Sequence, residues 1–347
     1  MLRITGAMPL FVALLLVGPS LLVPNTTRVE AQATSDLRDT LGAWREAYDA
    51  KDWDRAIGLS KRLVEMQPES PVHPYNYACV LALSGKNEEA VEWLLVSVDR
   101  GFNDPKLFAE DPDLASVRSF DGYKKALDSV RERVAKAESE FDERLKASPV
   151  RVVLPPNYGE LEKAPVIVAL HPFGGTPEWI VRQWRDVAAE RGAILLAPQA
   201  VFPQRNGFQW GNVEHAEKVF LRAFKLLEDL KADRDHVILT GFSQGAYMAF
   251  NLGMKHCEKF DGVIPVAGSY DPRWARPAGS SAKPRFVILA GSEDRATESN
   301  RVAEEHYKAA GIDVHLEVYE GLGHAFPRDR NRELLKAVGR IWPKSRR

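Results

Sequence analysis

The feature that most constrains the fold is the pentapeptide at residues 241–245, which reads Gly-Phe-Ser-Gln-Gly. It lies between an apolar run, Val237–Leu239, and a helix-forming run, Ala246–Phe250. A G-x-S-x-G sequence between a strand and a helix puts the serine, here Ser243, on a tight turn, because the flanking glycines leave room for the backbone to bend. The pattern therefore predicts a strand–turn–helix unit that holds an exposed hydroxyl above the end of a sheet.

Strand and helix patterns alternate over the second half of the chain. Strands are expected at Val150–Leu154, Pro165–Leu170, Ala193–Ala197, Val237–Leu239, Gly262–Val266, Arg285–Ala290 and Val314–Tyr319. Helices are expected at Val181–Arg191, Glu214–Leu230, Gln244–His256, Asn300–Ala310 and Arg330–Trp342. This alternation implies a mostly parallel sheet with helices on both faces and a site at the carboxyl ends of the strands.

A serine hydroxyl is a weak nucleophile at neutral pH unless a base takes its proton and a third group orients that base. Asp294 follows one expected strand, and Glu293 beside it stays open as an alternative. His324 lies on a glycine-bearing loop after the strand Val314–Tyr319. Ser243, Asp294 and His324 are therefore the candidate catalytic residues.

Acyl transfer also needs backbone N–H groups that stabilise a negatively charged oxygen. The Gln244 N–H, which follows the serine at the start of its helix, is the expected first donor. The second is expected from the loop His171–Gly175, with the Phe173 N–H preferred and the Gly174 N–H its nearest competitor, because Pro172 has no N–H. An ordinary strand–helix turn is the alternative interpretation of this loop.

Aromatic residues near this loop are candidates for the substrate pocket. Phe208 and Trp210 are the expected pocket walls, and His171, which is expected to shape the neighbouring loop, is the third residue assigned to the pocket. A position in the core or on the surface is the alternative for each aromatic side chain.

Four blocks together resemble the α/β-hydrolase superfamily, and within it the phospholipase/carboxylesterase branch that includes the acyl-protein thioesterases. The blocks are residues 168–175, 195–198, 241–246 and 321–324. The resemblance covers about residues 150 to 343 and implies that Ser243 is the nucleophile, His324 the general base and then acid, and Asp294 the orienting acid. His171-Pro172 departs from the His-Gly that is typical of this branch and is closer to some secreted esterases and depolymerases, which leaves the substrate open.

The first residues are typical of a secretory signal peptide. Arg3 precedes an apolar stretch from Ala7 to Val23, and Ala31-Gln32-Ala33 has the A-x-A form of a cleavage site. We expect residues 1–33 to be removed from an exported protein, periplasmic or extracellular. A membrane-anchored N-terminus is the alternative.

Residues 36–118 show helical patterns and a weak repeat. Ala56 and Ala90 occupy matching positions in two successive units, and Pro68 falls where such a unit ends. Their spacing fits the helix–turn–helix period of about 34 residues that is typical of tetratricopeptide repeats. This region is therefore expected to be an all-α tetratricopeptide-like domain. A connecting helix is expected at residues 119–148, before a catalytic domain at 149–347. Its apolar stripe predicts a packing face whose partner stays open.

Composition and residue spacing give no support for a nucleic-acid partner or a metal cofactor. The formal net charge is −1 with both signs mixed along the chain, which gives no argument for binding nucleic acid. The two cysteines, Cys79 and Cys257, are expected to be buried thiols, and no spacing is typical of a metal site. We expect no metal and no cofactor.

The sequence thus predicts a secreted serine hydrolase with an α/β-hydrolase fold, acting on carboxylic esters of small molecules or lipids, thioesters included. Two alternatives stay open. One is a serine peptidase of the same fold, and the other is a non-catalytic protein that binds a peptide through its helical repeats. A protein partner at the repeats is compatible with all three.

Overall fold

The computed structural model describes residues 26–272 and 284–343, with side chains described from Ser35 onward. The described residues form two compact units, which meet in sequence between residues 136 and 137. Residues 1–25 of the predicted signal peptide lie outside the described residues, so the signal peptide stays a prediction. Over the described ranges, no helix combines the length and the apolar character that a membrane span requires.

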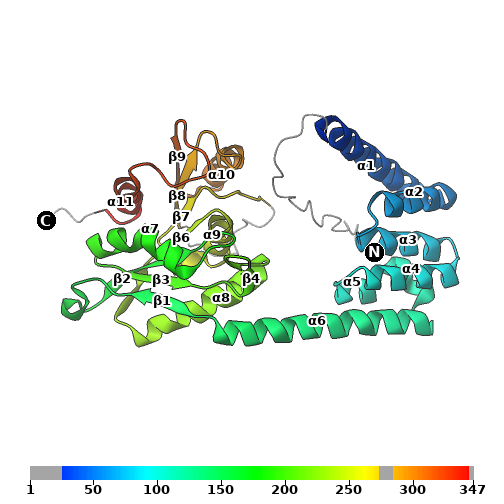
Figure 1. Cartoon of the computed structure of the whole chain (residues 1–347), viewed down its shortest axis with the longest axis horizontal. Helices are drawn as coiled ribbons and strands as arrows, with labels where there is room; N and C mark the ends of the chain where they lie inside the picture. Colours follow the sequence, from blue (N-terminus) through cyan, green and yellow to red (C-terminus); the bar gives the residue numbers. More distant parts are fainter. Residues whose placement is uncertain (1–25, 273–283, 344–347) are drawn as a thin grey trace. The chain divides into compact units, whose positions relative to one another are not determined.

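The first unit is built from helices alone over its described residues (Figure 1). They are α1 (Thr26–Asp49), α2 (Trp53–Met66), α3 (Val72–Leu83), α4 (Asn87–Asp99), α5 (Pro105–Glu110), the 3₁₀ helix η1 (Pro112–Val117) and the first part of α6 (Asp121–Ala147). Consecutive helices from α1 to α4 pack against each other. The expected all-helical N-terminal region is therefore confirmed.

The weak repeat of the sequence corresponds to a repeat of structure. The turns from α1 to α2 and from α3 to α4 contain Lys51 and Gly85, which hold matching positions in the two units and both have positive φ, +57° and +83°. Ala56 and Ala90, which also hold matching positions, are fully buried. Small side chains at these positions let the paired helices approach closely. The assignment to the tetratricopeptide class itself stays a prediction.

The apolar stripe on α6 contributes to two different cores. Tyr123 and Val130 pack with the helices of the first unit. Phe141, further along the same helix, packs in the core of the second unit, where its ring lies 5.8 Å from that of Phe202. Periodic spacing predicts a buried face, but it does not say which elements cover each part of that face.

The second unit contains a seven-stranded sheet in the order β1-β3-β2-β6-β7-β8-β9. Its strands are β1 (Val150–Val153), β2 (Ala164–Leu170), β3 (Ile194–Pro198), β6 (Ala232–Phe242), β7 (Gly262–Val266), β8 (Arg285–Gly291) and β9 (Val314–Tyr319). All neighbouring pairs are parallel except β1 with β3, which is antiparallel. The mostly parallel sheet predicted from the alternating pattern is confirmed.

Helices cover both faces of this sheet (Figure 1). They are α7 (Pro177–Glu190), α8 (Val213–Lys225), α9 (Gln244–Lys255), α10 (Thr297–Ala309) and α11 (Arg330–Ile341), with 3₁₀ turns η2 (Tyr158–Glu160), η3 (Leu226–Asp229) and η4 (Cys257–Lys259). Side chains of α7 and α11 share one core with the sheet, and side chains of α8, α9 and α10 share the other. Alternate residues of β2 enter opposite cores, Ile167 one and Val168 the other, as the two-residue period of a strand requires.

A short hairpin not expected from the sequence lies beside the main sheet. It pairs β4 (Phe202–Gln204) with β5 (Gly207–Gln209) in antiparallel register. Its two-residue loop is Arg205-Asn206, because Gln204 pairs with Gly207 across the hairpin.

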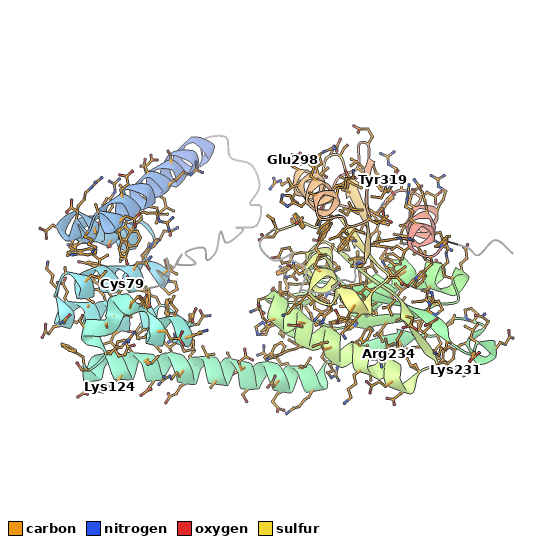
Figure 2. All side chains as sticks on the ribbon, turned by 180° about the vertical axis from the view of Figure 1, so that it is seen from behind. Cys79, Lys124, Lys231, Arg234, Glu298 and Tyr319 are labelled. Atoms are coloured by element: carbon orange, nitrogen blue, oxygen red, sulfur yellow. The ribbon has the colours of Figure 1, made fainter. Side chains whose placement is uncertain are left out.

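Both cysteines are buried free thiols, as expected. Cys79 lies among the helices of the first unit (Figure 2). Cys257 lies in η4 of the second unit.

Candidate active site

The turn between β6 and α9 has the strained geometry that the pentapeptide predicts. Ser243 has φ +55° and ψ −117°, a conformation that non-glycine residues rarely adopt. A Cβ on Gly241 would lie 2.3 Å from the Gly245 carbonyl oxygen, and a Cβ on Gly245 would lie 2.2 Å from the Leu170 carbonyl oxygen. Both positions therefore exclude any side chain. The turn leaves the Ser243 hydroxyl at the carboxyl end of a central strand.

The structure brings the three candidate catalytic residues together. The Ser243 hydroxyl lies 2.8 Å from His324 Nε2, and His324 Nδ1 lies 2.8 Å from Asp294 Oδ2. The other carboxylate oxygen of Asp294 accepts the Ala296 N–H at 3.0 Å. Asp294 is buried and Glu293 is exposed, so the aspartate, of the two alternatives, holds the imidazole. In this arrangement His324 donates through Nδ1 to the carboxylate and accepts the serine proton at Nε2.

Direct hydrogen bonds hold the loops of Asp294 and His324 together. The Glu293 N–H donates to the Leu322 carbonyl at 2.9 Å. The Gly321 N–H donates to the Ser292 hydroxyl, also at 2.9 Å. These bonds link neighbouring strand ends, and they limit movement of the imidazole relative to the carboxylate.

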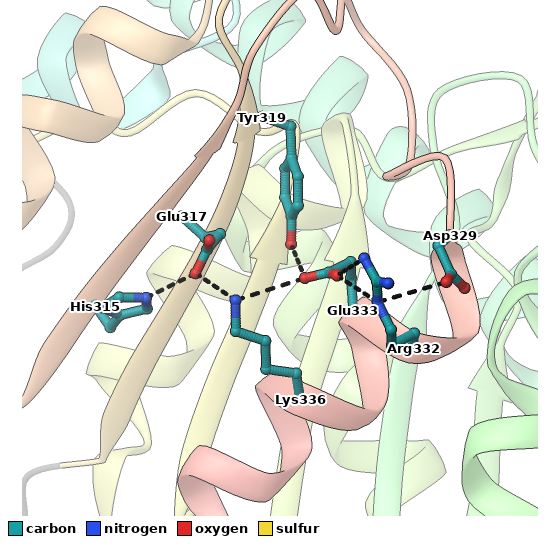
Figure 3. Close-up of polar contacts among 7 residues, drawn as sticks. All are labelled: His315, Glu317, Tyr319, Asp329, Arg332, Glu333 and Lys336. Carbon is teal, nitrogen blue, oxygen red and sulfur yellow. Dashed lines mark hydrogen bonds and ion pairs between the residues drawn. The ribbon is translucent and has the colours of Figure 1, made fainter.

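A polar network fixes the strand end from which the His324 loop starts (Figure 3). The Tyr319 hydroxyl donates to the Glu333 carboxylate on α11 at 3.2 Å. Lys336, one turn further along α11, lies 3.1 Å from the Glu317 carboxylate and 3.7 Å from that of Glu333. Edge strand β9 is thereby joined to α11 just before the loop begins.

Aromatic rings surround one side of His324, a feature that sequence reasoning missed. The Phe242 ring lies 5.2 Å from the imidazole and stacks on Phe326 at 4.9 Å. Trp179 of α7 lies 5.4 Å from Phe242. In the sequence, Phe242 directly precedes Ser243 and Phe326 lies two positions after His324. These two positions could have indicated aromatic packing near the imidazole. This packing restricts the orientation of the imidazole.

The loop after β2 forms a tight turn. The Gly175 N–H donates to the Pro172 carbonyl at 2.9 Å, and Gly174 has φ +68°. The Gly174 N–H donates to the Phe208 carbonyl at 2.9 Å, so this competitor for the second oxyanion donor already has an acceptor. Among the described residues, no acceptor for the N–H of Phe173 is present.

The Gln244 N–H is the first donor position of α9. Ser243 caps this helix without a side-chain hydrogen bond to its first turn. Like the Phe173 N–H, the Gln244 N–H has no acceptor within residues 26–272 and 284–343. A helix N-terminus with open N–H groups favours a negatively charged oxygen.

Two of the three expected pocket residues do not line an accessible pocket. His171 is 0% exposed and Trp210 is 1% exposed, so neither side chain can contact a molecule that enters from solvent in this conformation. Phe208 is only partly buried and remains a candidate pocket wall. The prediction that His171 and Trp210 belong to the pocket is therefore wrong. Both side chains instead make buried hydrogen bonds: the Trp210 indole donates to the His171 carbonyl, and the His171 ring accepts the Ala200 N–H.

The burial of His171 has a consequence for stability at acidic pH. Burial lowers the pKa of this imidazole to about 4, against an ordinary value of about 6.5, since its charged form would lose hydration. The folded chain keeps His171 neutral, whereas the unfolded chain takes up a proton once the pH falls below about 6.5. The contribution of His171 to stability is therefore complete above about pH 6.5 and is lost down to about pH 4, roughly 3 kcal/mol in all.

We expect the variant His171→Asn to lack this pH dependence. The difference in unfolding free energy between wild type and variant should shrink by about 3 kcal/mol from about pH 7 to about pH 4. Urea titrations of both proteins at three pH values measure it. A difference that stays constant with pH would contradict the burial of a neutral imidazole.

One group of potential metal ligands occurs in the part of the chain that the structure describes. Cys79, Asp111 and Asp113 have ligand atoms within 4.8 Å of one another. The Tyr75 hydroxyl donates to Asp111 at 2.8 Å, and the Tyr48 hydroxyl donates to Asp113. Burial raises the pKa of the Cys79 thiol, which disfavours the thiolate that a metal would need. These contacts describe a hydrogen-bonded core cluster.

Comparison with protein families gives the second unit an identity. The model of the dienelactone hydrolase family matches residues 150–345, more than half of the 347 residues. The chain belongs to the dienelactone hydrolase family. The expected α/β-hydrolase fold is thereby confirmed for the region that carries Ser243, Asp294 and His324.

The individual proteins compared below share little sequence identity with this member of the dienelactone hydrolase family. The protein named "Putative esterase NocK" from Nocardia uniformis subsp. tsuyamanensis is 32% identical over 148 residues, which are 39% of this chain. The match spans 41% of that relative's length. Esterase PE8 has a crystal structure with 23% identity and a TM-score of 0.48, covering 56% of this chain and 98% of its own. A phospholipase/carboxylesterase from Dyadobacter fermentans has 18% identity and a TM-score of 0.45, covering 55% and 95%.

Proposed function

We propose that this protein is a serine-dependent hydrolase of carboxylic esters. The observation that carries the proposal is the continuous hydrogen-bond chain from Ser243 through His324 to Asp294, with 2.8 Å at each step. Membership of a hydrolase family and the esterase name of one relative support the same reaction class.

The acylation step follows from the positions of the donors and acceptors. Ser243 Oγ attacks the ester carbonyl carbon while its proton moves to His324 Nε2. The resulting imidazolium is stabilised by the Asp294 carboxylate, which stays ionised. The negative charge on the former carbonyl oxygen is stabilised by the N–H groups of Gln244 and Phe173, which have no acceptor among the described residues.

Collapse of this tetrahedral intermediate breaks the bond to the leaving group. His324 gives its proton to the departing alcohol or thiol, and the acyl group remains on Ser243. Water then attacks the acyl-enzyme, with His324 again acting as base, and the acid is released. Every proton in the cycle moves through His324, so these residues need no metal or cofactor for the chemistry.

Labelling with a fluorophosphonate probe tests this proposal. We expect the wild-type protein to be labelled at one serine and to hydrolyse p-nitrophenyl acyl esters. The Ser243→Ala variant should show neither reaction, because it lacks the nucleophile. Thermal unfolding of the variant checks that the fold is kept. A folded wild-type protein that is not labelled would overturn the proposal and favour a non-catalytic role for the chain.

A serine peptidase with the same residues is the second candidate. The same nucleophile and base attack esters and amides, so the triad alone does not separate the two. We propose the ester because one relative carries an esterase name. Turnover of a peptide anilide with negligible turnover of acyl esters would favour the peptidase.

Export and the breadth of substrates are further parts of the proposal. The apolar segment and the Ala31-Gln32-Ala33 sequence motivate an exported protein, and N-terminal sequencing of the mature chain tests for a start at Thr34.

Lipid esters and thioesters belong to the proposed substrate range because Ser243 chemistry is the same for both. A protein partner at the helical repeats stays a proposal.

A further inference from the structure

The two expected oxyanion donors lie on different segments, and one element joins them. The Phe173 N–H belongs to the loop after β2, and the Gln244 N–H belongs to the start of α9. The β4–β5 hairpin is bonded to the first segment, and Trp210, which directly follows β5, is bonded to both segments. A pair of donors stabilises an oxyanion only if the distance between them is fixed.

The hairpin is bonded to the loop through the backbone. The Gly174 N–H donates to the Phe208 carbonyl at 2.9 Å, and the Phe208 N–H donates to the Gly175 carbonyl at 3.0 Å. A Cβ on Gly207 would lie 2.4 Å from the Gly174 carbonyl oxygen, so this approach requires glycine there. The loop is therefore held against the edge of β5.

Trp210 bonds to both donor-bearing segments. Its backbone N–H donates to Gln244 Oε1 at 3.2 Å, and its indole Nε1–H donates to the His171 carbonyl at 2.7 Å. The indole also packs on the His171 imidazole at 4.8 Å. Trp210 is 1% exposed and its indole bond is buried, whereas its bond to the partly exposed Gln244 side chain is only partly buried.

His171 in turn sets the direction of the Phe173 N–H. Its Nδ1–H donates to the Pro172 carbonyl at 2.8 Å, and its Nε2 accepts the Ala200 N–H at 3.1 Å. The Pro172 carbonyl and the Phe173 N–H belong to one planar, trans peptide group, so they point in opposite directions. With the carbonyl turned toward His171 and Gly175, the N–H of that group is turned away from both.

We infer that Trp210 is a positioning residue that fixes the Phe173 and Gln244 amides relative to each other. It does so by bonding to the His171 carbonyl on one side and to the Gln244 side chain on the other. The inference rests on the proposed function, because positioning of oxyanion donors matters only if Ser243 performs acyl transfer.

The variant Trp210→Phe tests this role, because it keeps an aromatic ring and removes the indole donor. We expect kcat for p-nitrophenyl esters to fall about 10- to 100-fold, since an oxyanion donor acts mainly in the transition state and small displacements weaken it. KM should change less than about twofold, because ground-state binding makes little use of these donors. Affinity for phenylboronic acid, whose adduct with the serine is tetrahedral, should fall by a factor similar to that for kcat.

A matched control separates positioning from loss of packing. Trp184 on α7 is fully buried, and its Nε1 has no hydrogen-bond partner. Trp184→Phe therefore removes the same atoms from a core without breaking a hydrogen bond, and we expect kcat to stay within about twofold of wild type. Equal losses of kcat in Trp210→Phe and Trp184→Phe would overturn the inference.

A second variant keeps the test decisive if Trp210→Phe folds poorly. Gln244→Met removes the side-chain acceptor at a partly exposed position and leaves the Gln244 N–H in place. It should lower kcat with little change in KM. Unchanged kcat in Gln244→Met would contradict the inference. A wild-type protein that is not labelled by fluorophosphonate contradicts the proposed function instead, so the two failures are distinguishable.

Discussion

Replacing His324 by alanine is expected to lower kcat for acyl esters by a factor on the order of 10⁶. Ser243 and His324 lie 2.8 Å apart and act on the same proton, so neither is useful to catalysis without the other. We therefore expect the double variant Ser243→Ala/His324→Ala to be no slower than either single variant. Strong non-additivity of this kind indicates two residues that act as one unit.

Steady-state rates of the three variants, corrected for uncatalysed hydrolysis, measure this expectation. His236→Ala is a suitable control, because this histidine is exposed and pairs with Asp233 at 2.8 Å on the protein surface. It should retain wild-type kcat. Losses that simply multiply in the double variant would mean that Ser243 and His324 act in separate steps, and the proposed mechanism would be wrong.

Local patterns in the sequence predicted that Ser243, His324 and a carboxylate at position 293 or 294 lie at one edge of the sheet. Each lies just after a strand with an apolar or alternating pattern, and parallel strands bring their carboxyl ends to one edge of the sheet. The parallel strand order therefore brings these residues to the same edge of the sheet. The choice between Glu293 and Asp294 could not be made from the sequence, because both follow the same strand and only burial separates them.

The roles of His171 and Trp210 were not predictable in the same way. An aromatic residue near a site is equally compatible with a pocket wall and with a buried support, and sequence alone does not give the direction of a side chain. The deciding facts are long-range hydrogen bonds, such as the one from the Trp210 indole to the His171 carbonyl. The Asn206-Gly207 dipeptide is a common hairpin signal, although here the two-residue loop is Arg205-Asn206 and Gly207 already belongs to β5.

The apolar stripe of α6 shows a related limit. Tyr123 and Phe141 follow one helical period, yet they pack in the cores of different units. Hydrophobic periodicity measures which face of a helix is buried and carries no information on the element that covers it. A helix can therefore be predicted correctly while the division of its contacts remains unknown.

Replacing Asp294 by asparagine is expected to lower kcat by a factor of about 10⁴ while the fold is kept. The carboxylate accepts the His324 Nδ1–H at 2.8 Å, which leaves Nε2 unprotonated and able to accept the serine proton. An asparagine amide can turn its NH₂ group toward Nδ1, which then becomes an acceptor. The imidazole proton moves to Nε2, and the base that faces Ser243 is lost.

The matched control is Glu293→Gln, the same chemical change at the neighbouring exposed residue, for which we expect kcat near that of wild type. Steady-state kinetics with one acyl ester measures both variants. The two positions differ in burial. The Asp294 oxygens are bonded to His324 and to the Ala296 N–H and have little access to water, whereas Glu293 is exposed. A larger loss in Glu293→Gln than in Asp294→Asn would assign the orienting role to the glutamate. Equal activity of wild type and Asp294→Asn would mean that the tautomer of His324 does not depend on this carboxylate.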